Sequence, residues 1–316
     1  MKISPSFFTV VLLLASISLA LSQNTPPWSN GSNAPAEQRG YIFRVPDVDN
    51  VPDLHGNPTD AKLVIFIGGN QFFVLPQLIT AFERHHPKLR GHIFYETLPP
   101  GVLQKQIAAD NAITLGNLTI QIKPDVYEAG TRVLHEMEQH GQLNRIVEYA
   151  TNDLEIMVAA GNPKGIRSLT DLGRPDIRLS MPSPQSEGLA KQIATSLRKE
   201  GGKELYQSVY EHKVKDGETV LTEIHHRQTP MRIMNGQADA GVTWSSEVRF
   251  QQSIGNPIQG IVIPANRNTT AIYAAGMMAH ASHARAAWEW LSFLRGREAQ
   301  AIYRKYGFRS ISDSFN

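Results

Sequence analysis

Cysteine is absent from the 316 residues of the chain. This absence excludes disulfide bonds, thiolate zinc sites, iron–sulfur clusters, a cysteine nucleophile and a lipid anchor on an N-terminal cysteine. A large excess of one charge is also missing, because 31 basic and 29 acidic residues leave a formal net charge of +2. No stripe of basic and aromatic residues occurs, so nucleic acid is not an expected partner. The fold must therefore be stabilised by packing alone, and a charged ligand must be held by a local site.

Long apolar runs are scarce as well, and only residues 7–21 form one. Lys2 precedes this run, and it ends in the small-x-small triplet Ala20-Leu21-Ser22, which is typical of a cleaved secretory signal. A membrane anchor is the alternative, but the run of about 15 residues is shorter than the roughly 20 that a spanning helix needs. Residues 1–22 are therefore predicted to be a signal peptide, and the protein is expected to be exported.

Proline is concentrated in residues 23–60, where six prolines stand among Asn, Ser, Gly and Asp. Proline lacks a backbone N–H, so this composition disfavours both helices and sheet ladders. We interpret residues 23–60 as a proline-rich N-terminal arm. The apolar stretch 41–45 is suited to docking on the body of the protein, which would hold residues 53–56 against it. The role of the arm is left open.

The body of the chain alternates short apolar runs with helical periodicity, which is typical of the α/β class. With 41% hydrophobic residues it is large enough for roughly two compact units. The predicted strands are 62–67, 91–96, 125–127, 154–159, 177–181 and 240–244. The predicted helices are 75–86, 101–110, 188–199 and a short helix with Thr229 as N-cap before Pro230, and residues 273–306 also have helical spacing. We expect one lobe from residues 61–150 plus 265–316 and a second from 151–264.

Eight segments of this body occur in a characteristic order. They are residues 66–70 (FIGGN), 81–83, 100–107, 124–130, 150–154, 161–172, 235–242 and 305–308. This order resembles the periplasmic solute-binding proteins of ABC importers, type II, and in particular the molybdate-binding family. The resemblance implies a two-lobe fold in which each lobe is a mostly parallel sheet flanked by helices. It also implies a small anion held between the lobes by strand-end loops and helix N-termini.

The same resemblance implies a non-enzymatic role in transport. The lobes close over the solute, and a membrane permease recognises the closed form. A sensor domain is an alternative partner. The resemblance further implies a periplasmic monomer without a cofactor, a catalytic residue or a metal ligand, and the lack of cysteine means that it is not a lipoprotein.

In the first lobe, the resemblance places ligand contacts after two strands. The family's first contact falls on Asn70, whose amide can donate, accept or cap a helix. The family's next contact, a serine pair, is replaced here by Pro99-Pro100, which has no N–H to offer. Thr97 or the N–H of Gly101 or Val102 would have to take its place. Glu96 either faces the ligand as well or is a solvated strand end.

In the second lobe, the resemblance points to the loop before helix 188–199, to the start of the short helix and to the end of strand 240–244. Ser186 and Glu187 lie in the loop, and Glu187 either meets the ligand or only complements the helix dipole. His226 and Arg227 are expected to clamp the anionic group, unless they belong to a surface loop. Trp244 stands where the family has tyrosine, and it either covers the ligand or packs in the core.

These departures from the family pattern favour an organic anion over a bare oxyanion, because the site has large and functionalised side chains. A molybdate- or tungstate-type oxyanion is the alternative ligand. An exported hydrolase with a metal bound by His225, His226 and Glu187 is a less favoured alternative. Adjacent histidines rarely reach one ion from regular structure, and the sequence has no His-Glu-x-x-His motif.

Overall fold

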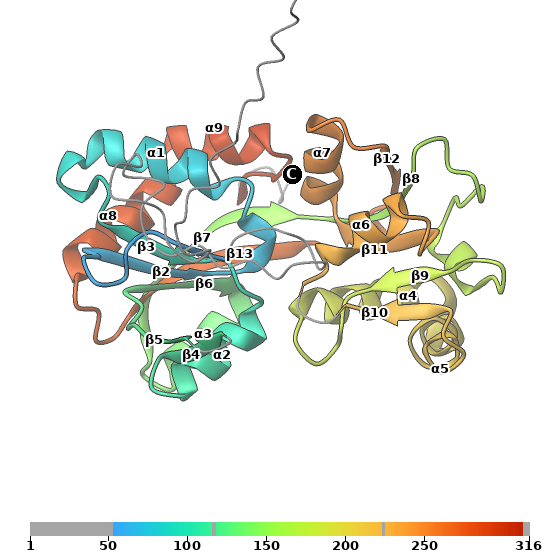
Figure 1. Cartoon of the computed structure of the whole chain (residues 1–316), viewed down its shortest axis with the longest axis horizontal. Coiled ribbons are helices and arrows are strands. Elements are labelled where there is room, and N and C mark those ends of the chain that lie inside the picture. The colour runs from blue at the N-terminus through green and yellow to red at the C-terminus, as the bar shows by residue number, and fades with distance from the viewer. Residues whose placement is uncertain (1–52, 116–117, 223–224, 312–316) are drawn as a thin grey trace, which may run out of the picture.

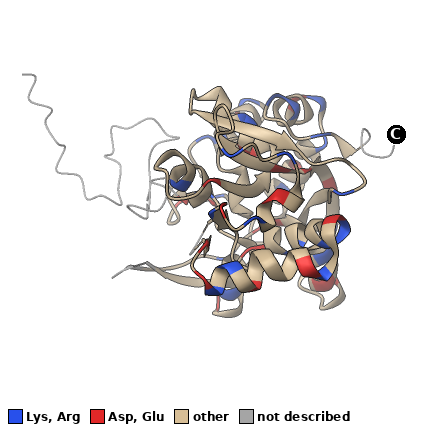
Figure 2. Ribbon diagram, turned by 90° about the vertical axis from the view of Figure 1, so that its right-hand side faces the viewer, with Lys and Arg blue, Asp and Glu red and all other residues tan. Residues whose placement is uncertain are grey.

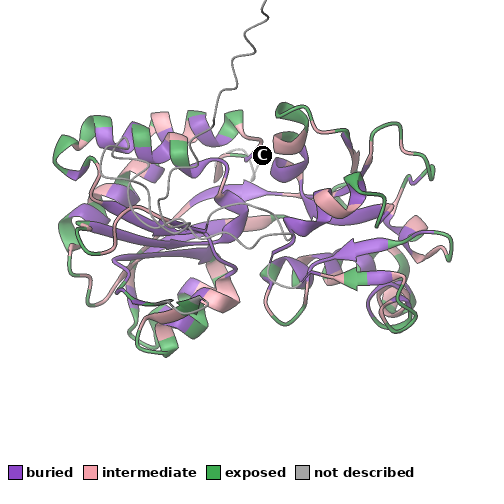
Figure 3. Cartoon of the chain, in the orientation of Figure 1, coloured by how far each residue is buried: buried purple, intermediate pink, exposed green. Residues whose placement is uncertain are grey.

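The structure is a computed structural model that describes residues 53–115, 118–222 and 225–311. The predicted signal peptide at 1–22 and most of the proline-rich arm lie outside the described residues. Two lobes lie side by side, each built on one sheet with helices on both faces (Figure 1). Burial is concentrated in the two sheets and in the helix faces turned toward them (Figure 3). The predicted α/β class and the two-lobe type II fold are confirmed.

The first sheet has six strands in the order β1-β3-β2-β6-β13-β7. Strands β3, β2 and β6 are parallel, and the other pairs are antiparallel. Every residue of β2 is buried, as expected for a strand covered by helices on both faces. The strands are β1 (Leu54–His55), β2 (Leu63–Ile67), β3 (Ile93–Glu96), β6 (Val126–Gly130), β7 (Leu143–Asn152) and β13 (Ala271–Met278).

Five helices cover this sheet. Helices α1 (Leu75–His85), α8 (Ala284–Leu294) and α9 (Arg297–Lys305) pack on one face, and α2 (Pro100–Ala108) and α3 (Thr131–Gln139) on the other (Figure 1). A two-stranded hairpin, β4 (Ala112–Leu115) and β5 (Leu118–Gln121), follows α2. Short 3₁₀ turns at Gly69–Gln71 (η2) and Pro87–Leu89 (η3) complete this lobe.

The second sheet has five strands in the order β10-β9-β11-β8-β12, with β10, β9 and β11 parallel and the other pairs antiparallel. Its strands are β8 (Leu154–Ala159), β9 (Leu179–Met181), β10 (Thr219–Leu221), β11 (Ala240–Trp244) and β12 (Ile258–Val262). Its helices are α4 (Gly188–Gln207), α5 (Lys213–Lys215), α6 (Gln228–Met234) and α7 (Ser245–Ser253), with a 3₁₀ helix η4 (Leu169–Gly173) and a π-helical turn η5 (Ser208–His212).

Most predicted elements occur within a few residues of their expected bounds, but three details were wrong. Residues 271–278 form strand β13 between β6 and β7 rather than helix, because this segment completes the first sheet. Thr229 is not an N-cap: α6 begins at Gln228, and the Thr229 hydroxyl lies 3.0 Å from that of Ser180. Helix α4 continues past residue 199 to Gln207 through a kink at Gly201-Gly202.

The lobes are connected and also touch. The chain passes from β7 to β8 at residues 152–154 and returns from β12 to β13 at residues 262–271. Phe250 on α7 stacks on Phe73 with ring centroids 4.7 Å apart, and it meets the edge of Phe72 at 5.3 Å. Acidic and basic residues alternate over the ribbon in Figure 2 without a region of one sign. Among the described residues, no helix combines the length and apolar character needed to cross a membrane.

Candidate functional site

A cavity of about 610 Å³ lies between the lobes. Cavities of a few hundred cubic ångströms are typical of small-molecule sites. The first lobe contributes residues 68–71, 99–101, 128–133 and 270–273 to its wall. The second lobe contributes residues 184–189, His225, His226 and Trp244. The wall is thus formed by strand-end loops of both sheets.

Helices α2, α3 and α4 begin at this cavity, as does α7, whose N-cap is Trp244 and whose first N–H already donates to the Asp153 carbonyl oxygen. The N-cap residues are Pro99 for α2, Gly130 for α3 and Glu187 for α4, and none of them makes a side-chain capping hydrogen bond. The first turn of a helix has N–H groups without intrahelical acceptors and carries a partial positive charge. The convergence of three such turns makes the cavity suitable for an anion without a full positive counter-charge.

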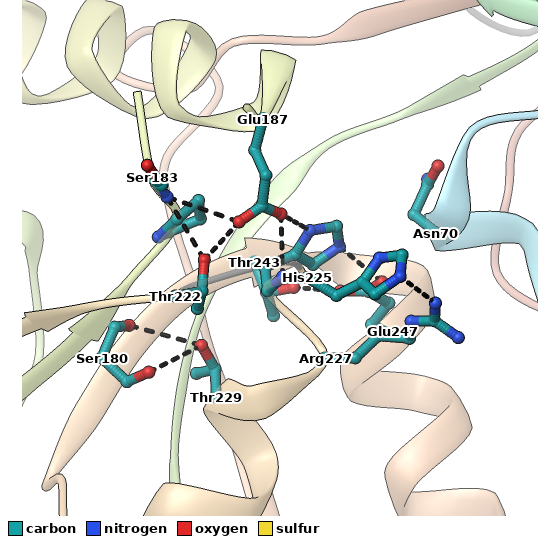
Figure 4. Close-up of polar contacts among 12 residues, drawn as sticks. Asn70, Ser180, Ser183, Glu187, Thr222, His225, Arg227, Thr229, Thr243 and Glu247 are labelled. Atoms are coloured by element: carbon teal, nitrogen blue, oxygen red, sulfur yellow. Dashed lines mark hydrogen bonds and ion pairs between the residues drawn. The ribbon is translucent and has the colours of Figure 1, made fainter. Parts of the chain in front are cut away.

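A buried ion-pair network lies behind the α4 turn (Figure 4). The carboxylate of Glu187 accepts hydrogen bonds from the backbone N–H of His226 at 2.8 Å, from His226 Nδ1, and from the hydroxyl of Thr222. The other ring nitrogen of His226 lies 2.7 Å from Glu247, whose second carboxylate oxygen accepts the hydroxyl of Thr243. The imidazole of His226 is therefore held between two carboxylates.

This arrangement fixes the charge state of the network. Burial alone would lower the pKa of His226, but the carboxylates of Glu247 and Glu187 outweigh burial and raise this pKa to about 10. Burial would likewise raise the pKa of Glu187, but the charge and the hydrogen bonds of His226 lower it. Both ring nitrogens of an imidazolium are donors, and here both are used inside the protein. His226 and Glu187 thus position the start of α4 next to α7.

Arg227 is engaged by the first lobe. Its Nη2 donates to the carboxylate of Asp53 and lies 3.3 Å from the carbonyl oxygen of Thr97. His225 Nε2 lies 3.2 Å from the same Asp53 carboxylate. Arg227 and Thr97 are therefore brought together, but neither side chain is part of the cavity wall, whereas the clamp hypothesis places Arg227 on the ligand. The anion that Arg227 contacts belongs to the chain itself.

The remaining predicted residues lie at the cavity. The amide of Asn70 donates to the hydroxyl of Tyr273 at 2.5 Å. The indole of Trp244 is nearly buried and meets the ring of Tyr273 edge-on, so it belongs both to the core and to the wall. The hydroxyl oxygen of Ser186 is buried and has no hydrogen-bond partner within the described part of the chain. The Ser186 hydroxyl is thus not engaged by another described residue.

The α2 and α4 turns approach each other closely. A Cβ atom on Gly101 would lie 2.9 Å from the carbonyl oxygen of Ser186, which is closer than real Cβ contacts. Only glycine allows the two lobes to meet here. A side chain at position 101 would therefore force the α2 and α4 turns apart.

Six of the eight predicted site residues line the cavity, namely Asn70, Gly101, Ser186, Glu187, His226 and Trp244. Thr97 and Arg227 do not. Sequence reasoning missed Asp53 and Glu247, and it missed the start of α3. The pair Gly130-Thr131 at the end of a strand was a usable signal for α3, whereas a single aspartate in a proline-rich arm gave none. The ligand-binding roles of these residues stay proposals.

Glu96 is buried rather than solvated. Burial raises its pKa to about 8; a hydrogen bond from Gln106 lowers this pKa, and the charge of Asp53 raises it. Gln106 Nε2 donates to Glu96 Oε1 at 3.1 Å, while Glu96 Oε2 and Gln106 Oε1 are buried and have no other partner among the described residues. A proton on Glu96 would let the carboxyl donate back to the amide. Glu96 is thus expected to be protonated at neutral pH.

Replacing Glu96 by glutamine should stabilise the protein. A carboxyl with a raised pKa in the folded state makes folding less favourable as the pH rises from about 4.5 to about 8. Glutamine keeps the shape and avoids this loss, so Glu96→Gln is expected to raise the free energy of unfolding by up to about 4 kcal/mol at pH 8 and by little at pH 4. Urea unfolding at both pH values measures this, with the exposed Glu138→Gln as control. An equal effect at both pH values would contradict it.

The side chains proposed for a hydrolytic metal site do not converge. Glu187 binds His226, whereas His225 binds Asp53. No group of three His, Asp or Glu side chains suited to a metal ion occurs in residues 53–115, 118–222 and 225–311. The relatives described below are likewise solute-binding proteins rather than hydrolases.

Two α/β lobes that share a cavity lined by helix N-termini define a type II solute-binding protein. The chain belongs to the bacterial extracellular solute-binding protein family, whose model matches residues 63–309. This match covers the second sheet, the first sheet except β1, and all of the cavity wall. The predicted resemblance is therefore confirmed at the level of the family.

Individual relatives are distant. The chain is 27% identical to the sulfate-binding protein of Synechococcus elongatus over 166 residues, which is 50% of this chain and 47% of that protein. It is 24% identical to the molybdate-binding protein of Mycobacterium tuberculosis over 213 residues, which is 66% of this chain and 74% of that protein. The match therefore spans about half the length of the first relative. The structure of the sulfate-binding protein SubI from M. tuberculosis superposes with a TM-score of 0.65 at 19% identity, covering 79% of this chain and 86% of that one.

Proposed function

We propose that this protein captures a small oxyanion in the cavity between its lobes and delivers it to the membrane permease of an ABC importer. The convergence of the α2, α3 and α4 N-termini on one cavity carries this proposal. Backbone N–H groups at helix starts hold an ionised oxyanion without a salt bridge. Relatives that bind sulfate and molybdate support the same ligand class.

The contacts within the protein make an organic carboxylate a less suitable ligand than an oxyanion of the sulfate or molybdate type. His226 is held between Glu187 and Glu247, and Arg227 is bonded to Asp53, so neither cation is left to clamp a carboxylate. The donors that the described cavity wall presents include helix N–H groups, the hydroxyl of Ser186 and the side chains of Arg132 and Lys191. A cavity of about 610 Å³ also has room for an oxyanion that carries a short organic group.

The proposal includes the cellular role implied by the family. The protein would work as a monomer outside the cytoplasmic membrane, in the periplasm, after removal of residues 1–22. Its partners would be the solute and the permease, without nucleic acid. It would need neither a cofactor nor a catalytic residue, because closure of the lobes around the solute is its whole task.

Thermal unfolding with a panel of anions tests this function. Sulfate, molybdate, tungstate and phosphate are added to exhaustively dialysed protein, with chloride at equal ionic strength as the reference. A ligand at a hundred times its dissociation constant should add about 2.7 kcal/mol of stability. One of the four should do so and bind with a stoichiometry of one by calorimetry. No shift with any of them at millimolar concentration would refute oxyanion binding.

Ser186 provides the mutational part of this test. A hydrogen bond from a hydroxyl to a charged ligand contributes roughly 1.5–3 kcal/mol. Ser186→Ala should therefore weaken binding of the oxyanion at least tenfold without lowering the stability of the ligand-free protein. Ser253→Ala, which removes an exposed hydroxyl on α7, is the matched control and should leave the affinity unchanged. Equal affinity of Ser186→Ala and wild type would exclude Ser186 as a contact.

A further inference from the structure

The carboxylate of Asp53 links the two lobes. Its backbone belongs to the first lobe, because its carbonyl oxygen accepts the N–H of Thr97 at 2.8 Å and the next residue begins β1. Its side chain reaches the second lobe, where it contacts Arg227 Nη2 and lies 3.2 Å from His225 Nε2. A residue of the proline-rich arm thus bridges the interlobe boundary.

The contact is buried on every side. Asp53, Arg227 and His225 are 5%, 4% and 1% exposed. The guanidinium of Arg227 also lies over the ring of Phe72 at 4.7 Å and within 3.3 Å of the carbonyl oxygen of Thr97, so the first lobe forms a socket for it. Burial would raise the pKa of Asp53, but the charges of Arg227 and His225 lower it, and the carboxylate is ionised.

The socket borders the cavity. His225 contacts Asp53 and is also part of the cavity wall, and the next residue, His226, lines the wall as well. An arginine and a histidine at the edge of a ligand cavity would ordinarily attract the carboxylate of a solute. In this protein that place is filled from within the chain.

We infer that Asp53 is a built-in anion that occupies the carboxylate position on Arg227 and His225, and that it is a specificity determinant of the cavity. Its carboxylate pairs with the guanidinium of Arg227, so that Arg227 and His225 are not offered as a clamp to a carboxylate-bearing solute. It also ties the lobes together. The rejection of carboxylate-bearing solutes by the cavity rests on the proposed function. The occupancy of the socket by Asp53 does not depend on that function.

Chemical rescue tests the inference. Asp53→Ala removes the carboxylate and leaves a space of the size of formate or acetate. This variant should melt at a lower temperature than wild type and should regain at least half of the loss in 50 mM formate or acetate, compared with equal chloride. Wild type and the exposed control Asp60→Ala should respond equally to the three salts. Rescue no greater than that by chloride would overturn the inference.

Two further variants make the rescue specific. Asp53→Ala/Arg227→Leu has the same space but lacks the guanidinium, so formate should not restore it. Asp53→Asn fills the space without the charge, and it should be insensitive to formate as well. Rescue of the double variant to the same extent as Asp53→Ala would show that Arg227 does not hold the added carboxylate, and would also overturn the inference.

Calorimetry with oxalate measures the effect on specificity. Wild type is expected to show no binding of oxalate at 5 mM. Asp53→Ala should bind oxalate with a dissociation constant at least tenfold below 5 mM. If formate rescues Asp53→Ala but wild type binds no oxyanion, the proposed function fails and the built-in anion stands. If wild type binds an oxyanion but oxalate binding is the same in both proteins, the role of Asp53 in specificity fails alone.

Discussion

Replacing His226 by leucine is expected to lower the free energy of unfolding by about 3–5 kcal/mol at neutral pH, because it leaves Glu187 and Glu247 buried without their shared cation. The measurement is urea unfolding followed by circular dichroism. His280→Leu removes an exposed histidine and should change stability by no more than about 0.5 kcal/mol. A loss below 1 kcal/mol for His226→Leu would show that the network carries little stability.

The effect of His226 should depend on pH in one direction. Its pKa is about 10 in the folded protein and near 6.5 in the unfolded chain. The stabilisation that comes from a raised pKa is complete at pH values below the pKa of the unfolded chain. It is lost as the pH rises toward and through the pKa of the folded protein. The stability difference between wild type and His226→Leu should therefore shrink from about pH 6.5 to pH 10. A constant difference would contradict a charged imidazole.

The second large effect is expected for Gly101→Val, which should weaken oxyanion binding at least a hundredfold. A Cβ at this position would lie 2.9 Å from the carbonyl oxygen of Ser186, so the α2 and α4 turns would be forced apart. Anion contacts from one lobe would then be lost, and each tenfold loss corresponds to about 1.4 kcal/mol. Calorimetry measures the affinity, and small-angle scattering should show a larger radius of gyration.

Ala108→Val is the control for Gly101→Val. It adds branched bulk to the exposed last turn of the same helix, far from the second lobe. Its affinity should stay within threefold of wild type. If Gly101→Val bound the anion as wild type does, the lobes would not need the close approach seen at Ser186.

The elements that frame the site were predictable because their signals are local. The apolar run 63–67 and the helical stripe of 75–85 reveal a covered strand and its packing helix without knowledge of distant residues. The loops that line the cavity follow such strands directly. Asn70, Gly101 and Ser186 could therefore be placed from the sequence through the family resemblance.

The pairing of the charged residues could not be predicted, because it depends on contacts between distant parts of the chain. Arg227 is separated by 174 positions from Asp53, which lies in an arm without periodicity. Glu247 stands in the first turn of α7, where an acidic residue is ordinarily explained by the helix dipole. The clamp hypothesis placed Arg227 at the ligand, whereas Arg227 lies outside the cavity wall and is paired with Asp53, a partner that the sequence did not indicate.

The short strand β1 has a consequence for solubility. A sheet whose outermost strand is exposed can be extended by a strand from another molecule. Here residues 54–55 occupy the outer side of β3, and the chain turns away at Gly56, whose φ of +88° and contact with the Ile93 carbonyl admit no side chain. Residues 54–55 thereby shield this border of β3 from strand addition by another molecule, which lowers the tendency of the folded protein to aggregate.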